Sequence, residues 1–438
     1  MLKSLFSILI LFNVSLVCRA EQAATTPYYP EVNQPCPELT INNIMGVGKK
    51  SMNISEFKGK WLLLDFWSVG CSACVAAFPK LNKIRESFKD NLQVLLVGQE
   101  DPGNRIRNMY KRFESKMDLK LTTAFDSTLT NRLDLYSFPY IVVLDDKGIV
   151  RAVTASIDSI ALAKLMKGED ANLWPARRAH QESFVNYDYS KDFISNYGGK
   201  LGSDELSHSM LSRWKPGMPI LFPSLQSFKE QGFFDASAVR LNWLYNFAYF
   251  GVGAWGGVRA SDDDALYGNY WEKPLLELED SSVFKIDDSV SNLFCYSLVL
   301  PKDKITLKNI QHALQSDLQT SFGYRVTTEM RMMPYYKLVA LDKKITNLKT
   351  KGGTPSINGD RHASFYGRNI NIQSLIANLY GHNPYGPPFV DETGIDYNID
   401  LNLDCVFTNI NDIRRELNKH SLDLILSSKM MNVIVIKD

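Results

Sequence analysis

Net charge is almost absent from this sequence of 438 residues, in which 49 lysines and arginines face 48 aspartates and glutamates. The balance gives no electrostatic reason to expect binding to nucleic acid or to an anionic surface. Histidine is also scarce, with six residues, and those in the C-terminal half do not have the spacing of metal ligands. We therefore expect no metal, no cofactor and no nucleic-acid partner. The 45% apolar and 11% aromatic content is typical of a folded chain with two or three domains.

Long apolar runs are missing as well, except near the N-terminus. Lys3, the apolar stretch 5–17 and Cys18-Arg19-Ala20 follow one another in the order of a secretory signal peptide, which we assign to residues 1–20. The apolar stretch is too short to span a membrane comfortably. An alternative is that Cys18 becomes the lipidated N-terminus of a lipoprotein. Either way the sequence predicts export to the periplasm or cell envelope, as a soluble protein or one tethered to the membrane.

Cysteines are few, and their number argues against a disulfide scaffold. Beyond the signal peptide the chain contains a Cys71-x-x-Cys74 pair and three further cysteines, at 36, 295 and 405. An odd number is therefore left once Cys71 and Cys74 are paired. A Cys295–Cys405 bridge and two buried free thiols both remain open as alternatives.

The stretch around the cysteine pair has a strand-to-helix pattern. The apolar run 61–67, interrupted by Asp65, is typical of a strand buried on both faces. After the cysteines, apolar residues recur at spacings of three and four, which predicts a helix. Cys71 should therefore stand at a helix N-terminus, where unpaired N–H groups and the helix dipole stabilise a thiolate. Because a thiolate attacks disulfides, we expect Cys71 to be reactive.

The same alternation of strands and helices extends from about residue 31 to residue 169. Strands are expected at 92–98, 140–144 and 149–154, and helices at 105–115 and 157–166. An Asp-Asp-Lys-Gly turn joins the last two strands as a hairpin. The pattern predicts an α/β sheet with helices on both faces.

On these residues, 31–169 resembles the thioredoxin-fold domain of the exported TlpA/ResA-type thiol–disulfide oxidoreductases. The resemblance is carried by the motifs Asn-Gln-Pro-Cys-Pro-Glu-Leu at 33–39, Leu-Asp-Phe-Trp at 64–67, Cys-Ser-Ala-Cys at 71–74 and Ser-Phe-Pro-Tyr at 137–140. A lone C-x-x-C also occurs in zinc sites, but no second C-x-x-C or C-x-x-H follows here. The combination of strand, C-x-x-C, helix and a distant Phe-Pro before another strand is the specific part.

The resemblance implies a role for each motif. Cys71 would form the mixed disulfide with a partner, and Cys74, shielded inside the helix, would resolve it. Pro139 would form the family's cis-proline loop and hold its backbone beside the sulfurs. The chain would then reduce disulfides of envelope proteins, using protein thiols and disulfides as substrates and a membrane protein as electron donor.

Asp65 lies six residues before Cys71, as the buried aspartate of thioredoxin does. Burial favours the neutral form of a carboxyl, so Asp65 is a candidate to exchange a proton with Cys74. The alternative is an aspartate at a strand end that reaches solvent or a backbone amide. The sequence also departs from ResA-like proteins. Ala77 replaces their glutamate, Gly70 their usual tryptophan and Ala73 their usual proline. All three changes lie close to the cysteine pair, where redox potential and partner choice are set.

The remaining chain divides into a predicted linker with some local structure at 170–231 and a duplicated α+β domain at 232–438. Residues 239–249 match 370–380, and each copy continues with a strand, a helix and two further strands. We interpret the domain as two similar αββ-type repeats. In each copy a Met-Met pair is expected in the second half of a hairpin. The region resembles a domain of unknown function found in exported proteins of soil bacteria.

Two functions remain open on the sequence alone. The first is an exported thiol–disulfide oxidoreductase, and the alternative is an envelope binding module in which the thioredoxin fold is a weakly active scaffold. A thiol peroxidase is disfavoured, because the position three before Cys71 is Ser68 where that family has threonine. The sequence does not give the physiological substrate, the direction of electron flow or the oligomeric state.

Overall fold

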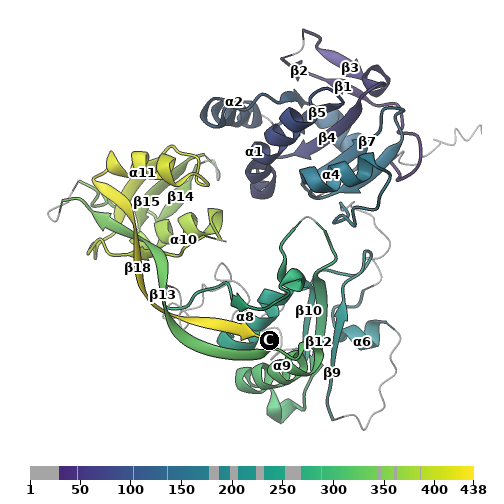
Figure 1. Cartoon of the computed structure of the whole chain (residues 1–438). Coiled ribbons are helices and arrows are strands. Elements are labelled where there is room, and N and C mark those ends of the chain that lie inside the picture. Colours follow the sequence, from purple (N-terminus) through teal and green to yellow (C-terminus); the bar gives the residue numbers. More distant parts are fainter. Residues whose placement is uncertain are drawn as a thin grey trace, which may run out of the picture.

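The computed structural model (Figure 1) describes residues 29–46, 48–101, 103–135, 137–176, 187–197, 206–222, 231–251, 268–287, 289–342, 347–359, 363–384 and 386–438. The signal peptide and the lipid anchor at Cys18 lie outside these residues, so both stay predictions. Within the described residues, no helix is long and apolar enough to cross a membrane. Figure 1 shows an N-terminal unit, drawn in purple to teal, and two further lobes that contain the green and yellow parts of the chain.

The N-terminal unit is built around a six-stranded sheet with the order β2-β6-β5-β4-β7-β8. Its strands are β2 (Ile44–Met45), β4 (Trp61–Trp67), β5 (Leu92–Gly98), β6 (Thr122–Phe125), β7 (Tyr140–Leu144) and β8 (Val150–Thr154). Strands β4, β5 and β6 run parallel, and the other three join antiparallel. Every residue of β4 after Trp61 is buried. Strand β4 is thus the doubly covered central strand that its apolar run predicts.

Helices cover both faces of this sheet. One face packs against helices α1 (Ser72–Ser87), α2 (Arg105–Met117) and α4 (Ser159–Met166). The other face packs against α3 (Ser127–Arg132), strands β1 (Thr40–Asn42) and β3 (Ser51–Asn53), and the 3-10 helix η1 (Ile54–Phe57). Alternate residues of β4 serve the two cores: Leu63 and Trp67 face α1, whereas Leu64 and Phe66 face away from it. The predicted α/β architecture is confirmed.

The rest of the chain forms two lobes with a three-stranded sheet and two helices each (Figure 1). The first lobe has the sheet β10-β12-β9, and its elements are β9 (His208–Arg213), β10 (Phe233–Arg240), α8 (Leu241–Phe250), β12 (Leu293–Val299) and α9 (Leu307–Phe322). The second lobe has the sheet β14-β15-β17, and its elements are β14 (Ser356–Asn358), β15 (Phe365–Ile370), α10 (Ile372–His382), β17 (Ile399–Leu403) and α11 (Ile410–Asn418). Short pieces are α6 (Phe193–Asn196), η3 (Ser282–Phe284) and η4 (Lys302–Lys304).

Two long strands connect the lobes, and here the prediction from sequence is wrong. We expected a hairpin in each repeat, but β13 (Arg325–Ala340) and β18 (Leu422–Lys437) are each one continuous strand of 16 residues. The two strands pair antiparallel along their whole length, from Arg325 opposite Lys437 to Ala340 opposite Leu422. We call this pair the ribbon. Short parallel strands β11 (Leu275–Glu277) and β16 (Phe389–Asp391) join its outer edges.

The same order of elements occurs twice along this region. Each copy has, in order, a strand, a helix, a short strand, a strand, a helix and a long strand. In the first copy these are β10, α8, β11, β12, α9 and β13, and in the second they are β15, α10, β16, β17, α11 and β18. Strands β10 and β15 also carry irregularities in pairing, at Ala238 (φ 60°) and at Asn369 (φ 52°). The α+β class is confirmed, and the shared order supports the repeat, which itself remains a prediction.

The predicted linker contains more structure than its composition suggests. Strand β9 lies inside the interval 170–231 and pairs with β12 as an edge strand of the first lobe. Upstream, Trp174 stacks on Trp214, with ring centroids 5.7 Å apart. Part of the interval therefore belongs to the first lobe.

The N-terminal unit contacts the second lobe through the basic helix α2. Arg112 forms an ion pair with Asp404 at 3.1 Å, and Lys116 forms one with Asp412 at 3.5 Å. Lys116 Nζ also donates to the Asp404 carbonyl oxygen at 2.8 Å. Buried Ala363 and Val406 of the second lobe extend the apolar core that packs under α2. The contact therefore combines ion pairs with a small apolar patch.

Cys295 and Cys405 are both buried free thiols. Of the two alternatives left open by the sequence, the Cys295–Cys405 bridge is therefore wrong. Cys295 packs in the first lobe with Trp214 and Tyr187, whereas Cys405 belongs to the core around the ribbon ends. Cys36 is also free and is half-buried.

The pairing of the ribbon predicts which cysteine pairs will cross-link. Met332 lies directly opposite Met430, and directly opposed residues have Cα atoms about 4.5–5.5 Å apart, inside the range of about 4.4–6.8 Å that a disulfide needs. We expect Met332→Cys combined with Met430→Cys to form a disulfide on mild oxidation, detected by peptide mass mapping of the full chain. The control, Met330→Cys with Met430→Cys, is a diagonal pair and should cross-link poorly. Equal yields from the two pairs would contradict the register.

Candidate functional site

The candidate site lies where strand β4 passes into helix α1. The chain leaves β4 at Trp67, makes a short turn and enters α1 with Cys71 as the residue that caps the helix. The Cys74 backbone N–H donates to Cys71 Sγ over 3.1 Å. The sulfur thus occupies the position at which a helix N-terminus stabilises negative charge.

Cys71 and Cys74 form a disulfide, with an S–S distance of 1.98 Å and Cα atoms 5.4 Å apart. The two cysteines differ in exposure: Cys71 keeps 8% of its surface accessible, whereas Cys74 has none. A partner thiol can therefore reach Cys71 but not Cys74. The structure brings the predicted pair together in the oxidised state.

Pro139 stands at the same edge of the sheet as the cysteines. The Phe138–Pro139 peptide bond is cis, which is the geometry that the family resemblance implies. Strand β7 starts directly after it, at Tyr140, which pairs with Phe66 near the end of β4. This register places Pro139 beside the end of β4 that leads into the Cys71 turn.

Asp65 is fully buried in the middle of the sheet, between Leu96 of β5 and Ile141 of β7. It alternates with Leu63 and Trp67, so its side chain faces the core that contains Cys71 and Cys74. Neither carboxylate oxygen has a hydrogen-bond partner within the described part of the chain. Burial raises the pKa of Asp65 to about 8, and the nearby positive charge of Lys80 opposes this rise. The alternative of a solvated or amide-bound aspartate does not fit this environment.

Lys80 is a site residue that the sequence did not reveal. It lies on α1, between the core residues Phe78 and Leu81, and its Nζ donates to Ser156 Oγ at 3.3 Å. Its charge is the influence that opposes the raised pKa of Asp65. A lysine on a helix next to core positions is common, so only the fold could connect it to Asp65.

No other group of the described residues joins this site as a ligand set. Among the residues that the structure places, no cluster of three or more His, Cys, Asp or Glu side chains is arranged to hold a metal ion. The free Cys36 lies elsewhere, next to the β7–β8 turn, and its amide donates to the Gly148 carbonyl at 2.9 Å. Burial raises the pKa of the Cys36 thiol to about 12, which suppresses its thiolate.

Two family models match the chain. Residues 59–150 match a family described as thioredoxin-like, and residues 294–423 match one described as a protein of unknown function, DUF3738. The first match covers the site, so the N-terminal unit is a thioredoxin-like domain. Both resemblances proposed from the sequence are confirmed, and so is the thioredoxin fold of the N-terminal part.

Several characterised relatives match the N-terminal part. The thiol–disulfide oxidoreductase YkuV of Bacillus subtilis is 29% identical over 131 residues, which are 28% of this chain and 83% of that protein. The thioredoxin-like protein YneN of Bacillus subtilis is 24% identical over 121 residues, or 27% of this chain and 69% of that protein. The thiol–disulfide oxidoreductase ResA of Bacillus thuringiensis is 24% identical over 97 residues, which are 22% of this chain and 52% of that protein. The chain therefore spans about half the length of this ResA relative.

Solved structures match the same part. The thioredoxin domain of a thiol–disulfide oxidoreductase from Bacteroides vulgatus is 21% identical, with a TM-score of 0.27, and the match covers 32% of this chain and 96% of that one. The exposed lipoprotein thioredoxin of Streptococcus pneumoniae is 24% identical, with a TM-score of 0.25, and the match covers 30% and 99%.

The raised pKa of Asp65 predicts a pH-dependent cost in stability. An unfolded aspartate has a pKa of about 3.9, whereas that of folded Asp65 is about 8. Between these values the folded state holds a proton that the unfolded state has lost, so Asp65 destabilises the fold increasingly as pH rises. We expect the free energy of unfolding of Asp65→Asn, relative to that of the wild type, to increase by about 2–4 kcal/mol as the pH rises from 5 to 8. Urea unfolding of the oxidised chain measures this difference.

The control for this experiment is Asp118→Asn, because the Asp118 side chain is 89% exposed. Its stability relative to the wild type should stay nearly constant over the same pH range. A gain for Asp65→Asn that is the same at pH 5 and at pH 8 would contradict the raised pKa.

Proposed function

We propose that the chain is an exported thiol–disulfide oxidoreductase that reduces disulfides of envelope proteins through Cys71 and Cys74. The observation that carries the proposal is the asymmetry of the pair: Cys71 is accessible at a helix N-terminus, and Cys74 is sealed inside the helix. The thioredoxin-like domain and its oxidoreductase relatives support the same chemistry.

In the reducing direction the reaction begins from the dithiol. The Cys71 thiolate attacks a substrate disulfide, so the substrate S–S bond breaks, a mixed disulfide forms and one substrate thiolate leaves. The Cys74 thiolate then attacks Cys71 Sγ, which releases the second substrate thiolate and gives the Cys71–Cys74 disulfide seen here. Two electrons pass to the substrate, and the leaving thiolates take up protons.

Asp65 supplies a proton site for the buried half of this exchange. Cys74 has to lose a proton before it attacks, and its position excludes bulk water. The Asp65 carboxylate faces the same core and can take that proton, which leaves it protonated in the oxidised state. A pKa of about 8 is consistent with a carboxyl that holds a proton at neutral pH. Pro139, at the same edge of the sheet, would position the backbone of an extended substrate segment.

The place of action rests on the N-terminal sequence. Residues 1–20 have the composition of a secretory signal, with Cys18 as the site of a lipid anchor in the alternative form. A dithiol that works outside the cytosol needs a source of electrons, and we propose a membrane thiol donor that reduces Cys71–Cys74 after each cycle. The domain limits 31–169 and 232–438 belong to the same proposal.

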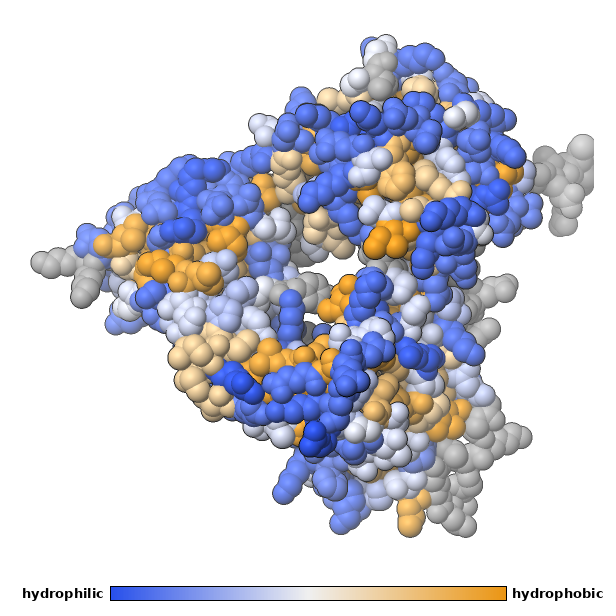
Figure 2. All heavy atoms as spheres, in the orientation of Figure 1, coloured by the Kyte–Doolittle hydropathy of each residue, from blue (hydrophilic) through white to orange (hydrophobic). Residues whose placement is uncertain are grey.

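A second candidate function is an envelope binding module, and one observation favours it. The middle of the ribbon exposes Met330, Met332, Leu426 and Met430 on one face, at 52%, 63%, 59% and 48% of their surfaces. Figure 2 shows apolar (orange) areas among the polar ones on the lobes that the ribbon connects. Exposed apolar patches of this kind mark contact surfaces in many proteins. In this reading the thioredoxin fold is a weakly active scaffold.

Cysteine variants test the proposed chemistry. We expect Cys71→Ser to lower the rate of insulin disulfide reduction, with dithiothreitol as electron source, by at least about a hundredfold, because the attacking thiolate is lost. Cys74→Ser should instead accumulate the mixed disulfide at Cys71, visible by mass spectrometry. Cys295→Ser changes a buried free thiol and serves as the control with an unchanged rate. A Cys71→Ser rate equal to that of the wild type would refute the proposal and leave the binding module.

The direction of electron flow is tested by the reduction potential of the pair, measured by equilibration with glutathione buffers. For a reductase we expect a value near that of thioredoxin, about −270 mV, and not near that of DsbA, about −120 mV. A value at the DsbA end would make the protein an oxidant or an isomerase that uses the same two cysteines.

A further inference from the structure

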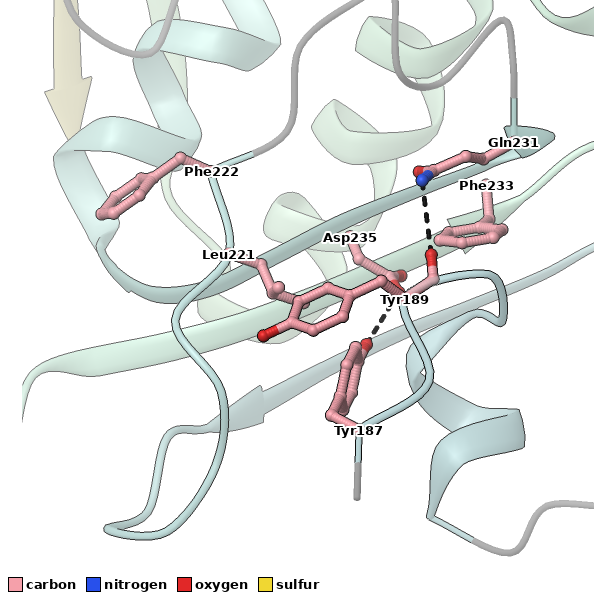
Figure 3. Close-up of a pocket in the computed structure, with 7 residues that line it drawn as sticks. All are labelled: Tyr187, Tyr189, Leu221, Phe222, Gln231, Phe233 and Asp235. Carbon is pink, nitrogen blue, oxygen red and sulfur yellow. Dashed lines mark hydrogen bonds between the residues drawn. The ribbon is translucent and has the colours of Figure 1, made fainter. Parts of the chain in front are cut away.

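A pocket in the first lobe, distant in sequence from the cysteine pair, has the features of a ligand site (Figure 3). It has a volume of about 130 Å³. Seven of the described residues line it: Tyr187, Tyr189, Leu221, Phe222, Gln231, Phe233 and Asp235. Four of the seven are aromatic, and one is a carboxylic acid. In Figure 3 the Tyr187 hydroxyl points toward Asp235, and the Tyr189 side chain extends toward Leu221.

Asp235 is the buried polar group of this pocket. It lies on strand β10 and only 6% of its surface is exposed. The Tyr187 hydroxyl donates to its Oδ2 over 3.4 Å, a long hydrogen bond, while Oδ1 has no partner within the residues that the structure describes. Ser297 stands directly opposite on β12, and its hydroxyl and the Phe193 backbone N–H both favour the ionised form of the carboxylate. Within the described residues Oδ1 still lacks a hydrogen bond of normal geometry, which is rare for a buried carboxylate oxygen.

The charge of Asp235 is not balanced by a cation among the described residues. Across the described residues, no lysine, arginine or histidine forms an ion pair with it. Burial raises the pKa of Asp235 to about 6; hydrogen bonding from Ser297 opposes this rise, and the negative charge of Asp192 adds to it. The carboxyl is therefore mostly ionised at neutral pH, in a partly apolar site where an unpaired charge is costly. A cationic ligand would remove this cost.

The aromatic walls favour a cation for a separate reason. The faces of tyrosine and phenylalanine rings carry negative electrostatic potential and attract an ammonium group within about 6 Å. The rings of Tyr187 and Tyr189 are 5.1 Å apart in an edge-to-face arrangement. Gln231 Nε2 donates to the Tyr189 carbonyl over 3.3 Å and so ties the Tyr189 backbone to the start of β10. Tyr189 and Phe222 are 57% and 66% exposed, which places them at the rim.

We propose that this pocket binds a small alkylammonium group, with Asp235 as its counter-ion and the surrounding aromatic rings as its walls. The ligand donates an N–H to Asp235 Oδ1, and its short apolar stem packs against the rings. The volume suits about four to seven non-hydrogen atoms, since an apolar protein cavity of about 150 Å³ holds one benzene molecule. Free amines and the lysine side chain of a peptide share this chemistry.

The test is isothermal titration calorimetry of the full oxidised chain with n-butylammonium, tetramethylammonium and n-butanol. We expect n-butylammonium to bind with a Kd of about 1 mM or tighter. Tetramethylammonium, which has no N–H, should bind more weakly, and neutral n-butanol should not bind measurably. Binding of n-butanol as tight as that of n-butylammonium, or no binding of n-butylammonium up to about 30 mM, would overturn the proposal.

Variants separate the counter-ion from the walls. Asp235→Asn keeps the shape and removes the charge, and it should weaken n-butylammonium binding by at least about 30-fold. The matched control in the same lobe is Asp303→Asn, whose side chain is 71% exposed and whose replacement should leave the Kd unchanged. An unchanged Kd for Asp235→Asn would refute the role of the carboxylate.

A rim variant keeps the test valid if Asp235→Asn fails to fold. Because Tyr189 is exposed, Tyr189→Ala should fold normally and weaken binding by about 3- to 30-fold, as expected for a lost cation–π contact. Tyr189→Phe should restore most of the affinity, because it keeps the ring. Equal binding by Tyr189→Ala and the wild type would overturn the aromatic part of the proposal. If the natural ligand is the lysine side chain of a peptide, Nα-acetyl-lysine methylamide should compete with n-butylammonium, because its side-chain ammonium is free.

Discussion

The structure of the N-terminal unit depends on how strand β4 ends. Strand β4 has a neighbouring strand on each side and apolar residues on both faces. The chain therefore continues beyond the C-terminal end of the strand and turns directly into a helix that covers one face of the sheet. That turn places Cys71 at the cap of α1, where the Cys74 amide donates to its sulfur. The position of the second cysteine follows, since two intervening residues bring Cys74 onto the inner side of the first helical turn. The difference in exposure between the two sulfurs is thus a consequence of backbone geometry.

The same strand holds the Asp65 carboxyl, whose ionisation in the buried sheet lowers the stability of the fold. Side chains on β4 alternate between two apolar cores, so Asp65 has no route to solvent from the centre of the sheet. A carboxyl in that place stays neutral to a higher pH than usual, which reduces stability above the ordinary aspartate pKa. A residue that costs stability and yet faces the core containing Cys71 and Cys74 fits the view that functional sites carry local destabilisation.

Elements formed by residues close together in the sequence were predicted, whereas contacts between residues far apart in the sequence were not. Strand β4, the cysteine cap and helices α1, α2 and α4 are local patterns, and each was predicted, whereas the short helix α3 was not. The ribbon was not, because Met332 pairs with Met430 across almost a hundred residues, and a break in hydrophobic pattern inside β13 resembles a turn. Hairpins are the default reading of two neighbouring strand-like runs. The Asp235 pocket was also missed, since all of its named lining residues except Phe233 and Asp235 come from an interval whose composition predicts a linker.

The contact between the N-terminal unit and the second lobe lies away from the start of α2. Helix α2 follows β5, which is parallel to β4, so α2 begins at the edge of the sheet where Cys71 lies and runs away from it. Arg112 and Lys116 lie in its second half, about 10–17 Å from its start at the rise of an α-helix. The second lobe is therefore held near the far end of α2. Exposed ion pairs such as Arg112–Asp404 stabilise little by themselves, and the small apolar patch adds a limited area. A polar, limited contact of this kind resembles a transient protein–protein interface, so it does not by itself fix the second lobe against the N-terminal unit.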